Sequence, residues 1–261
     1  MKLRGYYIKR DPSKLKLRVS YDKSSESRPA WIKIEGLPNG VNFISIFLGR
    51  RGKEGQRIQF YKTYLPQWLF LPIDFKSHEM KKFYDEFSKF YDKDLAQNSN
   101  NPKAANFLAK KLKKFSNPGV SVLDLGAGTG MISEIFYKEG YKDITLFDYS
   151  KGMLEKARKR HSLKSCKFIL GDVRKLNLHK KYDVVISVFS LGSSSYFSRD
   201  ELKSIYIKIK KHLKKNGILA VLGHTGTEFL KDNFSILEAG IYTIDKKRKY
   251  YTDYFIGRKM T

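Results

Sequence analysis

Short apolar runs alternate with amphipathic segments along most of the chain after residue 115. Each run is four to seven residues long, the usual length of a buried strand; the runs are residues 120–124, 144–148, 167–170, 182–188 and 217–223. Apolar positions three and four apart predict helices between them, at about 130–139, 151–160 and 199–215, whereas the separator 173–181 is too short for a long helix. This alternation predicts an α/β fold with a mostly parallel sheet that binds ligands at the carboxyl ends of its strands.

The last part of the chain departs from this alternation. We expect a helix that ends near Gly240, followed by strands at 241–244 and 250–256. A short Lys-rich turn joins these two strands, so they should form an antiparallel pair.

The first 75 residues show the period of two that is typical of half-buried strands. Apolar and charged residues alternate at 14–19 and 32–35, a Pro-Asn-Gly hairpin signal follows at 38–40, and further strands are expected at 43–48 and 58–64. The sequence therefore predicts a small basic all-β module over residues 1–75 and a second domain over residues 76–261.

Two helices are expected at the start of the second domain. The first carries an aromatic stripe, because these residues share one helical face: Met80, Phe83, Tyr84, Phe87, Phe90 and Tyr91. Pro102 suits the first turn of the second helix, which should run to about Phe115.

Composition places the chain among folded globular proteins. Hydrophobic residues make up 41% of its 261 residues and charged residues 30%. A single cysteine, Cys166, excludes an internal disulfide framework and is interpreted as a small buried residue. No basic start followed by an apolar segment is present, and no apolar run approaches the roughly 18 residues of a membrane span. We therefore expect a cytoplasmic protein without membrane insertion, and no metal site is predicted.

The charge is strongly one-sided. The chain has 52 Lys and Arg against 26 Asp and Glu, a net charge of +26. Such an excess favours RNA or another polyanion as a partner through long-range attraction and counterion release. Solvated helix faces in a lysine-rich proteome would give the same composition, so both interpretations stay open.

An aspartate closes three of the apolar runs: Asp124, Asp148 and Asp172, the last of which comes two residues after the strand predicted at 167–170. A carboxylate at the end of a buried strand costs several kcal/mol of desolvation unless donors or a cation meet it. Three such carboxylates along one sheet edge predict a ligand with three separate donor groups.

Gly126, Gly128 and Gly130 lie between the first of these strands and a helix. They allow a sharp turn and a close approach of the backbone to a ligand, while the helix N-terminus supplies N–H donors. A dinucleotide site has the spacing Gly-x-Gly-x-x-Gly and no anion beside the pyrophosphate, but this chain has Gly-x-Gly-x-Gly and Asp124. An ammonium at Asp124, a ribose at Asp148 and an adenine amine at Asp172 together describe S-adenosylmethionine.

The motifs VLDLGAGTG (122–130), FDYS (147–150), GDV (171–173) and YDVVI (182–186) resemble those of the class I S-adenosylmethionine-dependent methyltransferases. The resemblance spans about residues 83–256 and implies a Rossmann-like seven-stranded sheet, mostly parallel with an antiparallel last strand. It also implies S-adenosyl-L-methionine as cofactor and S-adenosyl-L-homocysteine as product.

The resemblance assigns roles to individual residues. Asp124 and Gly126 would face the methionine end and Asp148 the ribose hydroxyls, Tyr149 and Met153 would pack near the ribose and adenine, and Asp172 with Val173 would hold the adenine edge. Tyr91 would belong to a helix that covers the cofactor, or would be an ordinary core aromatic. The remaining candidate cofactor contacts are Ala127, Gly128, Gly130 and Ser190.

The acceptor should bind at the ends of the fourth and fifth strands. His224 is the candidate for acid-base or acceptor contact and Tyr196 a second candidate, although in-line methyl transfer needs a base only when the acceptor must lose a proton. An Asn-Pro-Pro-Tyr type motif, common in methyltransferases that act on base amines or glutamine, is absent after the fourth strand, and so is a cysteine nucleophile.

Three functions remain open from the sequence. The chain could methylate a small-molecule or generic acceptor, or it could methylate tRNA or rRNA bound through the basic N-terminal module, whose aromatic and cationic residues suit base stacking. It could also be a non-catalytic subunit that binds the cofactor beside a partner. The sequence leaves the oligomeric state open.

Overall fold

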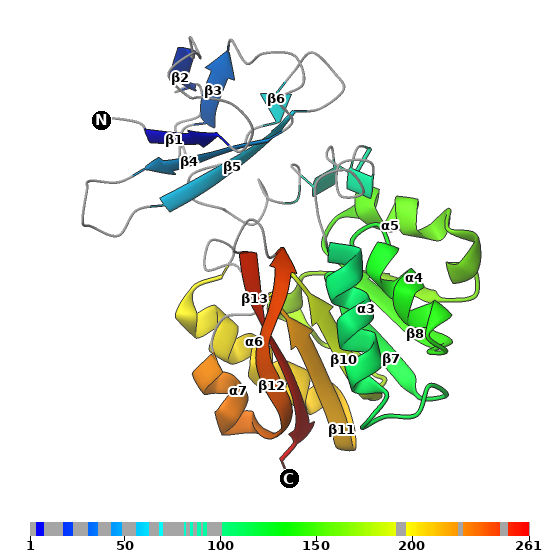
Figure 1. Cartoon of the computed structure of the whole chain (residues 1–261). Coiled ribbons are helices and arrows are strands. Elements are labelled where there is room, and N and C mark those ends of the chain that lie inside the picture. Colours follow the sequence, from blue (N-terminus) through cyan, green and yellow to red (C-terminus); the bar gives the residue numbers. More distant parts are fainter. Residues whose placement is uncertain are drawn as a thin grey trace. The chain divides into compact units, whose positions relative to one another are not determined.

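The structure is a computed structural model of the whole chain and divides into two compact units, Met1–Phe90 and Tyr91–Thr261 (Figure 1). The residues described are 4–7, 18–22, 31–35, 43–48, 56–62, 68–69, 81, 84–85, 88–89, 91–92, 101–191, 197–223, 227–245 and 250–260. The domain boundary expected at residues 75 and 76 falls outside these residues and stays a prediction.

The described residues of the first unit include six strands. They are β1 (Arg4–Tyr7), β2 (Arg18–Asp22), β3 (Trp31–Glu35), β4 (Phe43–Leu48), β5 (Gln56–Lys62) and β6 (Trp68–Leu69). β1, β4, β5 and β6 form one antiparallel sheet in that order, and β2 pairs with β3. Strands therefore occur where the alternating pattern predicts them, but the independent all-β module stays a prediction because most residues around these strands lie outside the described ones.

The second unit contains a seven-stranded sheet with the order β12-β13-β11-β10-β7-β8-β9. Its central and outer parallel strands are β7 (Ser121–Leu125), β8 (Asp143–Asp148), β9 (Lys167–Leu170), β10 (Tyr182–Val188) and β11 (Leu213–Leu222). β13 (Tyr250–Lys259) runs antiparallel to both β11 and β12 (Phe234–Asp245). The predicted mostly parallel sheet with an antiparallel last strand is confirmed.

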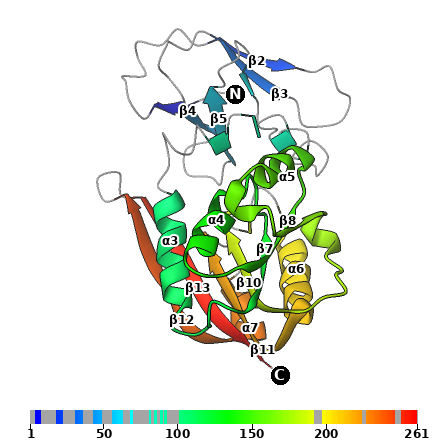
Figure 2. The same cartoon turned by 90° about the vertical axis from the view of Figure 1, so that its right-hand side faces the viewer.

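Helices cover both faces of this sheet (Figures 1 and 2). α3 (Asn101–Leu112), α4 (Met131–Lys138) and α5 (Lys151–Arg158) lie on one face, and α6 (Arg199–His212) and α7 (Thr227–Asn233) on the other. Short 3-10 helices, η2 (His161–Leu163) and η3 (Val173–Lys175), complete the connections, so the separator at 173–181 indeed holds no long helix. Pro102 lies in the first turn of α3, as expected.

The apolar runs build two cores because alternate residues of a strand point to opposite faces. Val122 of β7 and Ile186 of β10 pack under α3 and α4, whereas Leu123 and Val185, their neighbours in sequence, pack under α6. Because both faces of the sheet are buried, the sequences of its strands are continuous apolar runs, as is usual for parallel strands.

The expected helix ending near Gly240 is wrong. α7 ends at Asn233, and β12 begins at Phe234 and pairs with β13 over its whole length. Phe234 and Ile244 are buried by this pairing, so hydrogen bonding and packing along a long partner strand override the local pattern. The helix expected at 199–215 also ends earlier, at His212, where β11 begins.

No helix within the described ranges combines the length and the apolar character that a membrane crossing requires. The aromatic helix expected at 76–91 lies mostly outside the described residues, but residues 81, 84–85 and 91–92 are described and are helical. The strands that follow β7 are placed first on one side of it, as β8 and β9, and then on its other side, as β10 and β11. Open α/β sheets bind ligands in the crevice at such a reversal of strand order, here between β7 and β10.

Candidate cofactor site

The turn between β7 and α4 is built from left-handed glycines. Gly126, Gly128 and Gly130 have φ angles of 74°, 55° and 76°, a region that other L-residues enter only with strain. At Gly126 a Cβ would also lie 2.3 Å from Cβ of Ser190, whereas at Gly128 it would meet nothing within 4 Å. The turn therefore packs tightly against Ser190, just after β10, at Gly126, whereas Gly128 borders open space.

Backbone hydrogen bonds fix this turn to the end of β8. The N–H groups of Gly126 and Ala127 donate to the carbonyl oxygen of Phe147 over 2.8 and 3.1 Å, and the N–H of Gly128 donates to Oδ2 of Asp148 over 2.7 Å. Because these donors come from consecutive residues, the turn has little freedom to move relative to β8.

Asp148 is held from two sides. Its Oδ1 accepts a hydrogen bond of 2.8 Å from the N–H of Ser150, while its Oδ2 is bound by Gly128. Ser150 then caps α5, since its Oγ accepts from the N–H of Met153 over 3.1 Å. The carboxylate plane is thus fixed at the end of β8, beside the buried Met153 and the half-buried Tyr149.

Asp124 lies in β7, two residues before Gly126, and is 1% exposed. Its Oδ2 accepts a hydrogen bond of 2.5 Å from Oγ of Ser133, a fully buried residue of α4. Burial raises the pKa of Asp124 to about 7; the Ser133 hydrogen bond opposes this shift and the nearby charge of Asp148 adds to it. This carboxyl therefore changes its charge close to neutral pH.

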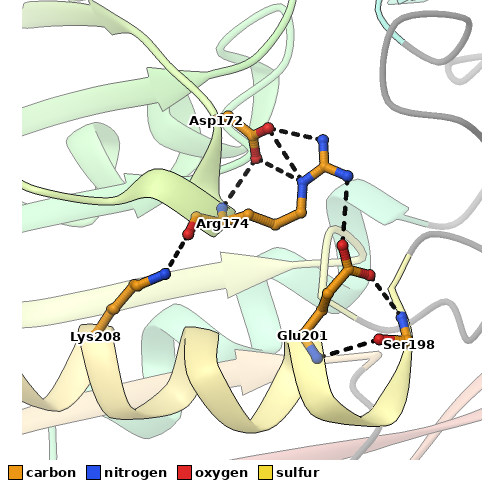
Figure 3. Close-up of polar contacts among 5 residues, drawn as sticks. All are labelled: Asp172, Arg174, Ser198, Glu201 and Lys208. Atoms are coloured by element: carbon orange, nitrogen blue, oxygen red, sulfur yellow. Dashed lines mark hydrogen bonds and ion pairs between the residues drawn. The ribbon is translucent and has the colours of Figure 1, made fainter.

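Asp172 is paired within the chain, as Figure 3 shows. Its oxygens accept from the backbone N–H of Arg174 at 2.9 Å, from Nε at 2.9 and 3.1 Å and from the terminal guanidinium nitrogen at 2.7 Å. Burial alone would raise the pKa of Asp172, but the hydrogen bonds and charge of Arg174 hold it below its ordinary value. The carboxylate stays ionised and fixed in orientation.

Arg174 extends this pairing to α6 (Figure 3). Its guanidinium lies 3.5 Å from Glu201, which forms a capping box with Ser198 at the start of α6, and its carbonyl oxygen accepts from Lys208. The segment after β9 is thereby tied to the helix that follows β10.

The first turn of α4 is available to an anion. Gly130 is its N-cap, and among the described residues no side chain caps it. Free N–H groups and the helix dipole at such an end favour a carboxylate or phosphate. Across the described part of the chain, no three His, Cys, Asp or Glu side chains are grouped so as to hold a metal ion.

The sequence pattern of a methyltransferase domain matches residues 122–217, the segment that contains most of β7, the glycine-rich turn, β8 with Asp148 at its end, and β9 with Asp172 just after it. Residues 122–217 therefore belong to a methyltransferase domain, of the class I S-adenosylmethionine-dependent kind.

A curated relative of the methyltransferase domain is a malonyl-acyl-carrier-protein O-methyltransferase of Acetivibrio thermocellus, 30% identical over 161 residues. The match covers 60% of this chain and 52% of that protein, so the chain spans about half the length of the curated relatives it matches.

Two solved structures show the same fold. The magnesium protoporphyrin IX methyltransferase ChlM of Synechocystis PCC 6803, with bound S-adenosylmethionine, aligns with a TM-score of 0.51 and 17% identity over 72% of this chain and 86% of that one. The [4+2]-cyclase SpnF aligns with a TM-score of 0.57 and 15% identity over 71% of this chain and 97% of that one.

The methyltransferase domain brings most of the expected cofactor residues to one sheet edge. Asp124, Gly126, Asp148 and Asp172 lie at or just beyond the ends of β7, β8 and β9. Their neighbours in this group are Ala127, Gly128, Gly130, Tyr149, Met153 and Val173. Which of these side chains touch the cofactor stays a prediction.

Ser190 follows β10 and donates a hydrogen bond of 2.6 Å to the carbonyl oxygen of Leu125, so it braces the end of β7. Tyr91 is helical and half-buried. The candidate acceptor residues Tyr196 and His224 lie outside the described residues, and their roles stay predictions.

Sequence reasoning missed Ser133 and Arg174. Ser133 follows Asp124 by nine residues and lies on the inner face of α4, a position that the helical period could have marked. Arg174 forms an Asp-x-Arg pair with Asp172, a spacing close enough for a local ion pair.

The open space at Gly128 and the contact at Gly126 predict unequal costs for the same substitution. Gly128→Ala should lower the free energy of unfolding by about 1–2 kcal/mol, the usual cost of a left-handed alanine. Gly126→Ala should cost at least about 1 kcal/mol more, because its Cβ also collides with Ser190. Urea denaturation of the two variants measures both values, and equal costs would contradict the packing at Ser190.

The Arg174–Asp172 pair predicts a stability difference that depends on pH. The lowered pKa of Asp172 means that the pair stabilises the fold above the ordinary pKa of an aspartate and that this contribution is lost as pH falls through the lowered value. Arg174→Met should cost roughly 1–2 kcal/mol at pH 7 and progressively less in acid.

A control for this measurement is Arg199→Met. Arg199 also forms an ion pair, with Glu228 at 3.4 Å, but its side chain is 78% exposed, so its loss should leave the unfolding free energy nearly unchanged. An Arg174→Met cost that is the same at pH 7 and in acid would exclude the Asp172 pair as its source.

Proposed function

We propose that this protein transfers the methyl group of S-adenosylmethionine to an acceptor by in-line displacement. The observation that carries the proposal is the carboxylate of Asp148, held by the N–H groups of Gly128 and Ser150 beside a left-handed glycine turn. The family of the domain supports the same function.

The residues at the sheet edge fit the parts of this cofactor. The fixed carboxylate of Asp148 suits the two ribose hydroxyls, and the uncapped first turn of α4 suits the carboxylate of the methionine end. Asp124, two residues before the turn, has a pKa near neutrality, so a nearby ammonium would favour its ionised form. Asp172 and Val173 follow β9, where an adenine edge would meet a fixed acceptor.

In such a displacement the protein has to hold the cofactor and the acceptor in position, and it need not form a covalent bond to either of them. When bound, S-adenosylmethionine supplies an electrophilic methyl group on a sulfonium. The turn fixed to β8 and the buried Met153 limit movement and water at the site, which is the contribution that a displacement of this kind requires.

For the acceptor we propose a small acyl compound or other small molecule that offers an oxygen nucleophile. The support is the similarity to the malonyl-acyl-carrier-protein O-methyltransferase, which extends over 60% of this chain. A carboxylate acceptor carries no proton at neutral pH, so its methylation would need no general base. His224 and Tyr196 would then contact the acceptor rather than remove a proton.

The net charge of +26 keeps an RNA acceptor as the second candidate. Binding to RNA would weaken steeply as salt is raised, because each neutralised phosphate releases counterions. Incubation of the chain with methyl-labelled S-adenosylmethionine, followed by separation of small molecules, carrier-bound acyl groups, protein and RNA, distinguishes the candidates. Label in RNA would reject the small acceptor, and label in no fraction would favour the non-catalytic subunit.

Binding of S-adenosylhomocysteine tests the assignment of Asp148. Asp148→Asn should weaken binding by about 10- to 100-fold, since the amide cannot accept from both ribose hydroxyls while holding the turn. Asp143→Asn is a matched control, because Asp143 begins the same strand and pairs with Lys180 at 2.9 Å on the opposite edge. Titration calorimetry should show this loss of affinity for Asp148→Asn and not for Asp143→Asn. Equal affinities of the two variants would show that Asp148 has no role in the site.

The buried carboxyl of Asp124 predicts opposite effects on stability and binding. Its raised pKa means that the folded protein loses stability as pH rises from about 4 to about 7, so Asp124→Asn should be more stable than wild type at pH 8, by roughly 2–4 kcal/mol. At pH 4 the two proteins should be equally stable.

The same variant should bind S-adenosylhomocysteine less tightly, because it cannot carry the negative charge that an ammonium favours. Wild-type affinity should rise with pH through about 7, and the variant should show no such rise. Thermal melts and calorimetry from pH 5 to 8 measure both effects. A variant that is less stable than wild type at pH 8 would show that the Asp124 carboxyl is not destabilising.

A further inference from the structure

Arg160 joins four separate segments of the methyltransferase domain. It follows α5, and its Nε donates to the carbonyl oxygen of Thr129 over 2.6 Å. Its two terminal nitrogens lie 2.8 Å from Glu134 and 2.5 Å from Asp92. Every nitrogen of this guanidinium thus has an oxygen partner, and the side chain is 18% exposed.

Asp92 closes the arrangement. Besides pairing with Arg160, it accepts a hydrogen bond from Oγ1 of Thr129, so Thr129 is bound through its hydroxyl by Asp92 and through its carbonyl by Arg160. Thr129 is 1% exposed and lies between Gly128 and Gly130 in the glycine-rich turn. Asp92 directly follows Tyr91, a candidate cofactor contact.

Glu134 keeps the guanidinium in place from the side of α4. Glu134 also accepts a hydrogen bond of 2.7 Å from Oγ of Ser162. Burial alone would raise the pKa of Glu134, but the Ser162 hydrogen bond and the charge of Arg160 hold it below its ordinary value. Two carboxylates and one carbonyl at fixed angles match the planar fork of arginine, which a lysine ammonium cannot reproduce.

We propose that Arg160 is a positioning residue that ties the segment of Tyr91 to the glycine-rich turn through Asp92, and so slows release of the cofactor. The proposal rests on the proposed function, because it assumes that the cofactor binds beside this turn. Asp148, at the end of β8, holds the turn at Gly128, and Arg160, after α5, holds it at the next residue, Thr129. The connection therefore links the position of Tyr91 to the conformation of the turn.

Release of S-adenosylhomocysteine from the full chain, measured by stopped flow and calorimetry, tests this role. Asp92→Asn should weaken binding about tenfold, mainly through faster dissociation, because it removes a charged partner from Arg160 but leaves the contacts of Arg160 with Thr129 and Glu134. Arg160→Met should have at least the same effect, and Arg160→Lys should restore little of it.

Matched controls separate this effect from a general loss of charge. Asp143→Asn removes an ion-paired aspartate of similar exposure, 50% against 44% for Asp92, and Arg199→Met removes an ion-paired arginine. Both should bind S-adenosylhomocysteine within about twofold of wild type.

A double variant tests whether the effect passes through Tyr91. In a Tyr91→Ala background, Asp92→Asn should add little to the dissociation rate, whereas an undiminished effect would overturn the connection to Tyr91. If wild type binds no S-adenosylhomocysteine, the proposed function fails. If wild type binds and Asp92→Asn dissociates as slowly as wild type, the role of Arg160 and Asp92 is rejected even if Arg160→Met does not fold.

Discussion

The turn from β7 into α4 is the constraint on which the rest of the site depends. Three left-handed glycines at alternate positions reverse the chain within a few residues, and Gly126 has no room for a side chain beside Ser190. Because the N–H groups of this turn are bound to Phe147 and Asp148, the turn also fixes the end of β8. A change in any of these contacts alters the position of the carboxylate at the next strand, so the site is a single unit rather than a set of independent contacts.

The three strand-end aspartates have a different electrostatic role from the one their sequence positions indicate. Each was expected to need a ligand to offset its desolvation, but each has donors within the protein: Ser133 for Asp124, two backbone N–H groups for Asp148, and Arg174 for Asp172. The donors differ in strength. A single hydroxyl leaves Asp124 with a raised pKa, whereas a guanidinium lowers that of Asp172. The carboxylates are thus oriented before any ligand binds, and Asp124, unlike Asp172, keeps a large part of its desolvation cost for a cation to offset.

The strand positions, the glycine-rich turn and the antiparallel end of the sheet followed from the sequence because they depend on local periods and on residues with few conformations. The contacts that join these elements did not. Arg160 and Asp92 are 68 residues apart, and nothing in the local pattern marks them as partners. The helix expected to reach Gly240 failed for a related reason, since β12 is set by pairing with β13 rather than by its own period. Local sequence determines elements well, whereas long-range polar contacts require the packed structure.

The fold and its turn constrain the cofactor more closely than they constrain the acceptor. The [4+2]-cyclase SpnF shares this fold, so the architecture alone does not establish methyl transfer. The sequence predicts that the acceptor binds at the ends of β10 and β11, and the backbone there is strained. Phe189 has a φ of 58°, which costs an aromatic residue about 1–2 kcal/mol, and its ring occupies the space that a Cβ at Gly223 would need, 2.4 Å away. Because the packing of Phe189 against Gly223 holds this strain in place, the ends of β10 and β11 keep one defined backbone conformation, which an acceptor bound there would have to fit.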